Sequence, residues 1–355
     1  MDHKILLDKM YNYGIRMSAL KLITSYLTNR RQYVQLTDPH EPTPCTSEPK
    51  LIDSGVPQGS VLGPLFYIIY VNSLVPTRNE KIKNTMFADD TTITTTGQTL
   101  QETEITATTY INTLLQDLAH HKLAVNKDKT NFMHFHTPQA TIPFTPTITI
   151  DTTVIQQVTF TKFLGIYIDQ HLKWDQHIDY ISGKITSGLF VLKQMTHISS
   201  QTVARTTYFA LVQSHLQYGI TIWGATKQQN MDRLLRLQKR AIRYMTGLTR
   251  TDSCKKQFTE LNILTVYSLY IYDTILWTIK HRDKLTTLGQ NHDYNTRHRT
   301  KLAYGRHRTT TYEQTVRYRG TKYLTYLPEQ LTDIAHTSTF KQYLKKYLLT
   351  KAFYI

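Results

Sequence analysis

Two adjacent carboxylates, Asp89 and Asp90, are the residues of this sequence best suited to do chemistry. They interrupt a segment rich in β-branched and aromatic residues over 82–96, and this pattern predicts a hairpin with the acids at its tip. Carboxylates held at one edge of a sheet can bind divalent cations, and phosphoryl transfer to a 3′-hydroxyl uses two such ions. An Asp-Asp pair alone is more often a solvated turn, so its interpretation depends on context.

A second segment, Gly55–Pro64, reads GVPQGSVLGP and holds three glycines and two prolines in ten residues. Such a backbone can approach a ligand closely and still enter a helix at Leu65. The segment fits neither the phosphate-binding loop of nucleotide hydrolases nor the dinucleotide-binding pattern. On its own it is also compatible with a plain turn that leads into a buried helix.

The charge of the chain indicates a polyanionic partner. The 355 residues carry 42 Lys and Arg against 26 Asp and Glu, a formal net charge of +16. This surplus favours nucleic acid or an anionic membrane. The longest apolar run, 61–71, is broken by Gly63 and Pro64 and is far shorter than a bilayer span. We therefore expect nucleic acid as the partner and no membrane.

The cysteines and the first residues bear on the compartment. Cys45 and Cys254 have no neighbours with metal-ligand spacing and are expected to be reduced thiols. Reduced thiols suit the nucleus or the cytoplasm. The first ten residues, MDHKILLDKM, carry charges where a secretory signal has its apolar stretch, so no such signal is expected there.

Hydrophobic periodicity divides the chain into three expected regions. Residues 1–173 mix helices and strands and predict an α+β fold, 174–282 are nearly pure helix, and 283–355 are basic and lose periodicity before a last helix near 338–349. The expected helices of the first region are 2–12, 16–29, 65–74 and 100–123, its strands are 32–36, 131–136 and 160–168, its loop is 37–50, and 137–153 is an exposed hairpin or loop. Three apolar stripes are expected in the helical region: Ile178, Ile181, Ile185, Leu189 and Leu192; Val203, Thr207, Leu211 and His215; and Leu234, Leu237, Ala241 and Tyr244.

Taken together, the two chemical segments are specific. GVPQGSVLGP followed about two dozen residues later by FADD resembles the reverse transcriptases of non-LTR retrotransposons, most closely the jockey-type group of animal elements. Further segments match in order along the chain: Asn126–Thr130, Phe163–Ile166, Tyr218–Gly219, Trp223–Gly224, Leu237–Arg243 and Tyr294–Arg299. The resemblance therefore covers nearly the whole chain.

The resemblance implies both a fold and an activity. Residues 1–173 would be part of a right-hand polymerase palm, an antiparallel sheet with packed helices, without the fingers and the first catalytic motif. Residues 174–282 would be a helical thumb and its extension, and 283–355 a basic segment in contact with nucleic acid. The implied activity is RNA-directed DNA polymerisation with an RNA template, a DNA primer, deoxynucleoside triphosphates and two Mg²⁺ or Mn²⁺ ions.

The resemblance also implies roles for single residues. The catalytic residues would be the metal-binding pair Asp89 and Asp90, with Lys129 near the triphosphate. The incoming nucleotide and the template would lie against Pro57, Gln58 and Gly59. The primer end would be held by Phe163, Leu164 and Gly165.

The pattern departs from the family at the start of the chain. The family has a Phe-Asp pair whose aspartate is the third metal ligand, three residues before an Asp-His that is here Asp2-His3. That ligand is expected just before Met1, and a step of three residues makes Asp2 a poor substitute. Two carboxylates hold two cations poorly against their mutual repulsion. The isolated chain is therefore expected to be a very poor polymerase.

The C-terminal segment is a second candidate for nucleic-acid contact. Residues 297–351 carry twelve Lys and Arg against three Asp and Glu, which is +9 of the chain's +16. Tyrosines alternate with these cations, so phosphates and bases both have partners there, although a solvated, partly disordered end is the alternative. The arginines expected to contact nucleic acid are Arg297, Arg299, Arg306, Arg308, Arg317 and Arg319. The alternative function is that of a non-catalytic nucleic-acid-binding remnant of a mobile element.

Overall fold

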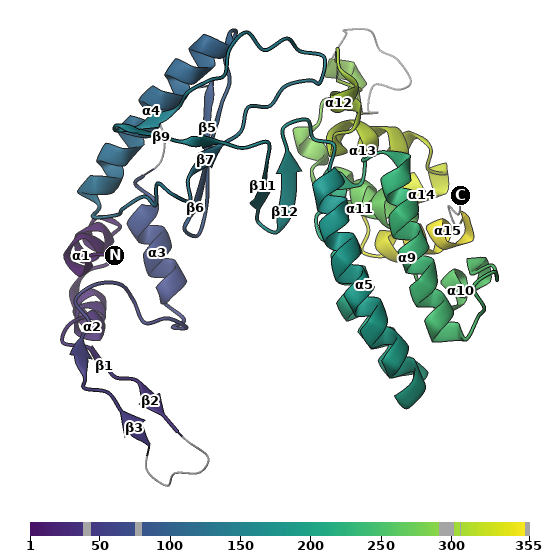
Figure 1. Cartoon of the computed structure of the whole chain (residues 1–355), viewed down its shortest axis with the longest axis horizontal. Coiled ribbons are helices and arrows are strands. Elements are labelled where there is room, and N and C mark those ends of the chain that lie inside the picture. The colour runs from purple at the N-terminus through teal and green to yellow at the C-terminus, as the bar shows by residue number, and fades with distance from the viewer. Residues whose placement is uncertain (38–43, 75–79, 291–301, 306, 352–355) are drawn as a thin grey trace. The chain divides into compact units, whose positions relative to one another are not determined.

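The computed structural model describes residues 1–37, 44–74, 80–290, 302–305 and 307–351. The chain forms two compact units, one made of Met1–His134 and Gln139–Val158, the other of Phe135–Pro138 and Thr159–Ile355. Figure 1 labels many of the helices and strands of both units. Their mixture confirms the α+β class expected from the sequence.

Three helices form the core of the first unit: α1 (His3–Asn12), α2 (Met17–Leu27) and α3 (Gly63–Val71). Asp2 is the N-cap of α1, because its carboxylate accepts a hydrogen bond from the Ile5 N–H at 3.1 Å. The fully or largely buried side chains between the helices are Leu6, Met10, Leu27, Phe66, Tyr70, Val71 and Leu74. These helices confirm the predictions for 2–12 and 16–29 and, with slightly earlier bounds, for 65–74.

Tyr70 joins three segments of this core. Its side chain is fully buried, and its hydroxyl donates to the His121 carbonyl oxygen at 2.6 Å and accepts from the Asp2 N–H at 3.1 Å. A buried phenol needs such partners for its polar end. α3 is thereby tied to the start of α1 and to the residue that follows α4 (Leu100–His120).

The hairpin expected over 82–96 is confirmed as β5 (Ile82–Phe87) and β6 (Asp90–Thr95), which pair antiparallel. The following helix, α4, packs along β6 (Figure 1). α4 begins after Thr99, whose hydroxyl accepts a hydrogen bond from the Glu102 N–H at 3.1 Å. The helix gives the two strands a firm support on one side.

The other strands of the first unit are only two residues long. They are β1 (Arg31–Gln32) with β4 (Lys50–Leu51), β2 (Gln35–Leu36) with β3 (Cys45–Thr46), β8 (Thr149–Ile150) with β9 (Thr153–Val154), and β7 (Asn131–Phe132) parallel to β10 (Gln156–Gln157). The loop expected over 37–50 was wrong in its described part, which holds β3 and the start of β4. Sequence reasoning missed β3 and β4 because both strands are exposed throughout, so their sequences show no alternation of apolar and polar residues.

The segment 137–153 ends in the predicted hairpin, β8–β9, but its end is less exposed than expected. Ile148 and Ile150 are buried in a small cluster with Ala107 of α4. The Thr- and Pro-rich composition concealed these two core residues. Among the described residues the strands form six two-stranded ladders, so the single antiparallel sheet expected of a palm is not seen.

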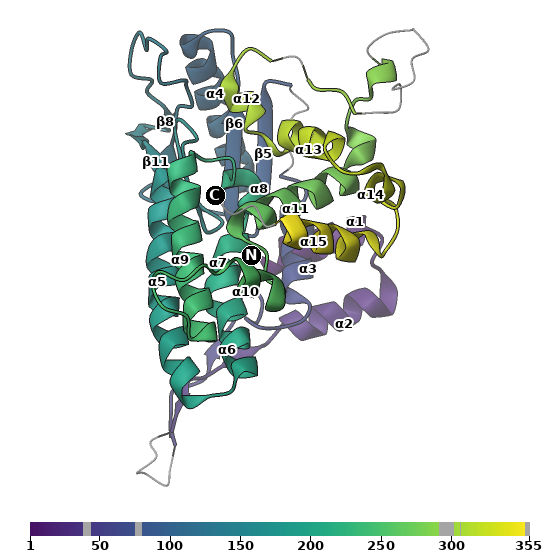
Figure 2. The same ribbon diagram turned by 90° about the vertical axis from the view of Figure 1, so that its right-hand side faces the viewer.

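The second unit begins with a hairpin, β11 (Phe160–Phe163) and β12 (Ile166–Asp169). The single strand expected over 160–168 is therefore wrong, because Leu164 and Gly165 form a turn within it. The helical region follows with α5 (Asp175–Ile198), and all five residues of its predicted stripe are buried. Figure 2 shows α9 (Gln228–Thr246) running beside α5.

The second predicted stripe is displaced by one residue. The buried residues are Ala204, Tyr208, Val212 and Leu216, on α6 (Gln201–Tyr208), η1 (Phe209–Gln213) and α7 (Ser214–Gln217). η1 is a π-helical turn, and its wider turn keeps residues four apart on one face. In the third stripe Leu234 and Ala241 are buried, whereas Leu237 and Tyr244 are half-buried.

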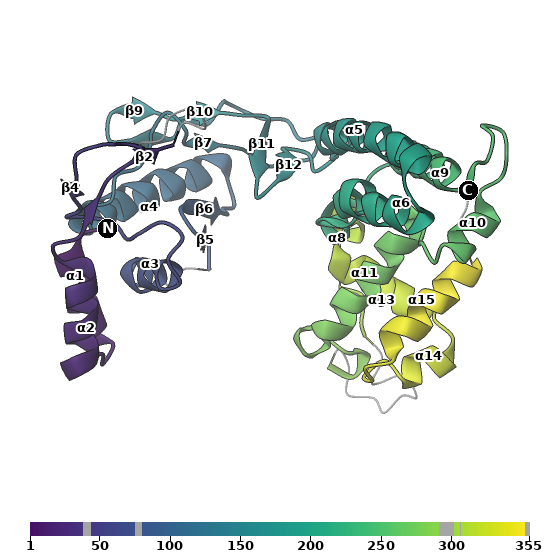
Figure 3. The same ribbon diagram turned by 90° about the horizontal axis from the view of Figure 1, so that it is seen from below.

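The C-terminal segment is not the aperiodic end that its sequence indicates. Its described part forms α12 (Thr310–Glu313), α13 (Val316–Thr325), α14 (Glu329–Asp333) and the expected last helix α15 (Phe340–Lys351). α13 and α15 pack on α11 (Val266–Lys280), as Figure 3 shows. A Cβ atom on Gly320 would lie 1.7 Å from the Thr278 hydroxyl oxygen, so this close approach needs glycine. The packing was missed because small residues, not an apolar stripe, bury α13.

The remaining helices of the second unit are short: α8 (Ile220–Trp223), α10 (Lys255–Glu260), η2 (Arg282–Lys284) and η3 (Leu288–Gln290). Across the described ranges, no helix combines the length and the apolar character that crossing a bilayer takes. Cys45 is exposed and Cys254 is buried, and the two thiols are not joined in a disulfide.

Candidate functional site

The two aspartates lie at the turn of the β5–β6 hairpin. Phe87 pairs with Asp90, which leaves Ala88 and Asp89 as a two-residue loop. Asp89 belongs to the loop, Asp90 begins β6, and both side chains are exposed. Neither carboxylate forms a hydrogen bond or an ion pair with another described residue. Both are therefore available to a ligand.

The loop holds Ala88 in an unfavourable conformation. Its φ is +52°, in the left-handed region where a Cβ atom crowds the backbone and where a two-residue hairpin loop usually has glycine. This conformation costs an L-residue roughly 1–2 kcal/mol. A contact from outside the loop is needed to stabilise it, and such strained residues gather at functional sites.

Tyr67 of α3 supplies a contact of this kind. Its hydroxyl donates a hydrogen bond to the Ala88 carbonyl oxygen at 2.9 Å. Burial raises the pKa of the Tyr67 hydroxyl, and the negative charge of Asp89 raises it further, so the phenol stays protonated at neutral pH. Sequence reasoning missed this residue because its apolar surroundings predict only a core aromatic side chain.

Asp89 and Asp90 have the donor chemistry that a divalent cation requires. Mg²⁺ and Mn²⁺ prefer carboxylate oxygens, and two adjacent acids offer four of them. In the described part of the chain, no three His, Cys, Asp or Glu side chains gather as a metal site. The hairpin therefore supplies two carboxylate ligands, and the described residues identify no third.

The GVPQGSVLGP segment forms a tight turn before α3. The Ser60 N–H donates to the Pro57 carbonyl oxygen at 3.2 Å, which makes Gln58 and Gly59 the central residues of a β-turn. The φ of Gly59 is +80°, as the third position of a type II turn requires. Gln58 is exposed, and the space beside Gly59 is open. A ligand can approach this backbone without meeting a side chain at Gly59.

The N-terminal residues hold this glycine-rich segment in place. The Gly55 N–H donates to the Met1 carbonyl oxygen at 2.7 Å, and His3 Nε2 lies 2.7 Å from the Gly55 carbonyl oxygen. Asp2 caps α1 with one carboxylate oxygen and binds the Lys122 ammonium with the other at 2.6 Å. The hydrogen bond from Lys122 lowers the pKa of Asp2. Asp2 therefore has a structural task, and its exclusion as a metal ligand stays a prediction.

Lys129 lies in the turn that follows α4. Its backbone N–H donates to Asn126 Oδ1 at 3.1 Å, and its side chain is exposed. No hydrogen bond or ion pair among the described residues joins it to Asp89 or Asp90. Its neighbour Lys127 pairs with Asp151 at 2.8 Å. The role of Lys129 near the triphosphate stays a prediction.

The predicted primer-holding residues lie in the second unit, at the turn between β11 and β12. Leu164 and Gly165 form its two-residue loop with φ of +46° and +83°, the signature of a type I′ turn. The Tyr218 hydroxyl donates to the Leu164 carbonyl oxygen at 2.6 Å. A Cβ atom on Gly165 would lie 3.4 Å from the Tyr218 ring. The turn is thus held by a tyrosine from the matched Tyr218–Gly219 segment.

Three of the six arginines expected to contact nucleic acid, Arg297, Arg299 and Arg306, lie outside the described residues. Arg308 and Arg317 are exposed. Arg319 is half-buried on α13, and its positive charge acts on Tyr323 and Tyr270. Arg308 and Arg317 are therefore the described arginines of this set that are free to meet a phosphate.

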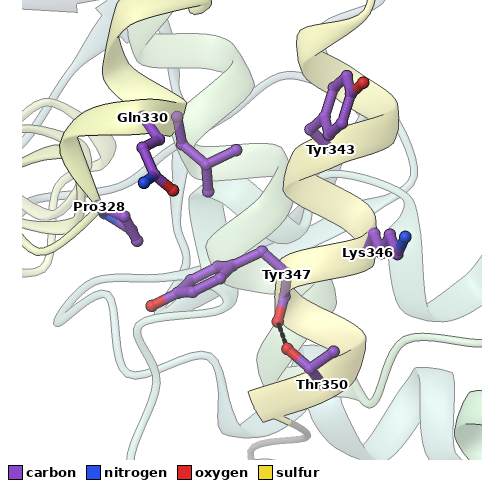
Figure 4. Close-up of a pocket in the computed structure, with 7 residues that line it drawn as sticks. Pro328, Gln330, Tyr343, Lys346, Tyr347 and Thr350 are labelled. Carbon is purple, nitrogen blue, oxygen red and sulfur yellow. Dashed lines mark hydrogen bonds between the residues drawn. The ribbon is translucent and has the colours of Figure 1, made fainter.

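A shallow depression of about 230 Å³ lies between α14 and α15 (Figure 4). Its lining residues are Pro328, Gln330, Leu331, Tyr343, Lys346, Tyr347 and Thr350. The Thr350 hydroxyl donates to the Tyr347 carbonyl oxygen at 2.7 Å, a bond within α15. None of the described residues that line the depression is acidic, so they offer no carboxylate to a metal ion.

Comparison with known proteins finds a similarity in the first part of the chain. Residues 1–168 match the family described as reverse transcriptase (RNA-dependent DNA polymerase). No solved structure matches the chain significantly.

Several relatives come from mobile elements of flies. The chain is 28% identical over 284 residues to the probable RNA-directed DNA polymerase from transposon BS of Drosophila melanogaster, a match over 75% of the chain and 30% of the relative. It is 23% identical over 318 residues to the corresponding protein from transposon X-element of the same species, over 85% of the chain and 32% of the relative. It is 24% identical over 213 residues to the RNA-directed DNA polymerase from mobile element jockey of Drosophila funebris, over 57% and 23%. The aligned part is at most about a third of each relative's length.

Proposed function

Because residues 1–168 match the family described as reverse transcriptase and the chain is similar to the polymerases of transposon BS and of the mobile element jockey, we propose that the chain is an RNA-directed DNA polymerase module of a jockey-type non-LTR retrotransposon. The observation that supports this function best is the β5–β6 turn, where two exposed and unpaired carboxylates are adjacent. The reaction is nucleotidyl transfer from a deoxynucleoside triphosphate to the 3′-hydroxyl of a DNA primer on an RNA template.

In this proposal Asp89 and Asp90 hold the divalent cations on which the family depends. When bound, these ions activate the attacking hydroxyl and stabilise the leaving pyrophosphate. The hairpin contributes rigidity, because its two-residue loop limits where the Asp89 carboxylate can lie and α4 packs on β6. Lys129 is proposed to donate a proton to the pyrophosphate.

The turn before α3 is proposed to bind the incoming nucleotide and the template. Pro57 and Gly59 shape the backbone, and Gln58 presents an exposed amide at the apex. Phe163, Leu164 and Gly165 of the second unit are proposed to hold the primer end. We further propose that 1–173 serve as part of the palm, 174–282 as thumb and extension, and 283–355 as a nucleic-acid contact.

The test is Mg²⁺-dependent extension of a DNA primer on an RNA template, because only a polymerase incorporates deoxynucleotides in template order. The chain is expressed together with any residues that precede it in its open reading frame, in wild-type form and as Asp89→Ala. Asp8→Ala, an exposed acid on α1, is the matched control. We expect extension to fall to the assay background with Asp89→Ala alone. Equal extension by all three proteins would refute the metal assignment.

The 355 residues by themselves are proposed to extend primers very slowly, since the described residues offer two carboxylates and no third. The comparison is between residues 1–355 and the same chain with its upstream residues, at equal concentration. Comparable rates from the two would show that two carboxylates suffice.

A second candidate is a non-catalytic nucleic-acid-binding protein, favoured by the +9 charge over 297–351. Deleting this segment is an unsuitable test, because α13 and α15 pack on α11. Replacing Arg308 and Arg317 together with Ala leaves that packing intact. Filter binding across a salt series gives the slope of log binding constant against log salt concentration. If both arginines contact phosphates, the magnitude of this slope should be smaller by up to about two in the variant. The control is Lys4→Ala with Lys21→Ala, and equal slopes in all proteins would exclude this surface.

A further inference from the structure

The two hairpins that carry the candidate residues share one device. In each, the first residue of a two-residue loop has a positive φ although it is not glycine: Ala88 at +52° and Leu164 at +46°. In each, a tyrosine hydroxyl from a helix or a helix end donates to the carbonyl oxygen of that residue. Tyr67 binds Ala88 at 2.9 Å, and Tyr218 binds Leu164 at 2.6 Å.

We propose that Tyr67 is a positioning residue of the candidate site, whose hydroxyl holds the Ala88 peptide so that the Asp89 carboxylate keeps one orientation. This inference rests on the proposed function. Ala88 and Asp89 share a peptide unit, so the carbonyl that Tyr67 binds belongs to the plane that also contains the Asp89 nitrogen. Rotation of that plane would turn Asp89 and its side chain.

The environment of the loop explains why an external contact is needed. Phe87 is 60% exposed, and Asp89 and Asp90 are exposed as well, so packing does not hold the turn. α4 packs on β6. Among the described residues, no side chain of α4 forms a hydrogen bond with Ala88 or Asp89. The Tyr67 hydroxyl is the described side-chain group that bonds the loop backbone.

The ring and the hydroxyl of Tyr67 have separate tasks. The ring is part of the partly buried layer around the α1–α3 core. The hydroxyl reaches outward to Ala88. Tyr67→Phe therefore removes the bond to the loop and keeps the packing, which makes the proposal testable without unfolding the unit.

The Tyr218 contact shows that the arrangement is not peculiar to one turn. Tyr218 is itself oriented, because the Trp223 indole N–H donates to its carbonyl oxygen at 2.9 Å. The second hairpin belongs to another unit and another turn type. Two unrelated loops with the same strained position and the same kind of donor support a positioning function for the hydroxyl.

The first test measures hydrogen–deuterium exchange of the backbone amides over 82–95 in the full chain. Tyr67→Phe should raise exchange there on the order of fivefold, because one hydrogen bond is lost, and should leave α1 and α4 unchanged. Tyr13→Phe is the control: its hydroxyl accepts from Asn72 of the same unit at 2.6 Å and does not touch the hairpin. Adding Ala88→Gly to Tyr67→Phe should reverse at least half of the increase, because glycine tolerates a positive φ.

The second test uses the polymerase with its upstream residues. Tyr67→Phe should lower kcat on the order of fivefold and raise the Mg²⁺ concentration for half-maximal rate, with an unchanged KM for the primer–template. The positioning role would be overturned if the amides over 82–95 exchanged in Tyr67→Phe at the same rate as in the wild type, or if exchange rose equally throughout the unit. An exchange increase confined to the hairpin, in a protein without polymerase activity, would refute the proposed function and leave the contact with Ala88 established.

Discussion

The β5–β6 and β11–β12 hairpins have equally short loops and similar tyrosine contacts, yet their acidic residues differ in burial and in hydrogen bonding. In the first, Asp89 and Asp90 are exposed and have no described partner. In the second, Asp169 at the end of β12 is buried, and its carboxylate accepts from the N–H groups of His171, Lys173 and Trp174 at 3.0, 3.1 and 2.7 Å. Both kinds of acid lie at or beside the end of a strand, so position alone does not tell them apart. A carboxylate whose hydrogen bonds are satisfied within the protein stabilises the fold, whereas one without partners can bind a ligand.

The loops themselves also differ. The second has a positive φ at both positions, which matches the twist of the paired strands, and its second position is occupied by glycine, Gly165. The first has a positive φ at Ala88 alone and places an acid at the other position. Both turns have a non-glycine residue at a positive φ with a tyrosine contact. The second also has glycine at its other positive φ, so it depends less on that contact than the first does.

The largest expected effect separates the two kinds of acid. Asp169→Ala should lower the free energy of unfolding of the second unit by about 3 kcal/mol, because three N–H groups lose a buried charged acceptor. Asp89→Ala, the matched variant at an exposed carboxylate, should change stability by less than about 0.5 kcal/mol. Urea unfolding followed by circular dichroism measures both. The contrast is wrong if the two variants are equally stable.

A pH effect on stability is expected at the second hairpin and the helix behind it. His177 of α5 is buried, and its Nδ1 accepts from the Tyr167 N–H of β12 at 3.4 Å. Burial lowers the pKa of His177 to about 4. Its contribution is therefore complete above the unfolded pKa, near 6.5, and is lost as the pH falls through about 4, an effect of about 2–3 kcal/mol. Unfolding at pH 7 and pH 4.5 should show a smaller difference in His177→Gln than in wild type.

Substitutions in the two loops should change the free energy of unfolding in opposite directions. Gly165→Ala should cost about 1–2 kcal/mol, since φ is +83° and the new Cβ atom meets the Tyr218 ring. Ala88→Gly should be neutral or stabilise by up to about 1 kcal/mol, because it removes strain while the unfolded chain gains freedom. Thermal unfolding checks both signs. Destabilisation of equal size in both would show that Ala88 is not strained.

The smallest expected effect distinguishes the tasks of the two tyrosines. Tyr67→Phe should act on kcat, whereas Tyr218→Phe should raise KM for the primer–template on the order of fivefold, because it loosens the proposed primer-holding turn. Steady-state extension kinetics of the two variants gives both constants. The same change in the same constant for both variants would contradict separate tasks.

Much of the candidate site could be predicted from the sequence, because its elements are local. The β-branched and aromatic residues around Asp89 and Asp90 predict the β5–β6 hairpin, and the Pro57–Ser60 turn follows from Gly59 at a position that needs a positive φ. The stripe on α5 determines which face of that helix is buried. Each of these features depends on residues within a few positions of one another.

Only the tertiary structure decided the contacts that join distant segments. Tyr67 and Ala88 are 21 residues apart, and Tyr218 and Leu164 are 54 apart, so no local pattern announces either bond. The packing of α13 on α11 is concealed for a similar reason, because Gly320 allows close approach without an apolar stripe. The sequence by itself determined which acids stand at the turn and what kind of chemistry they suit. The fold decided what holds that turn, since a hydrogen bond depends on where two atoms meet in space and not on their order along the chain.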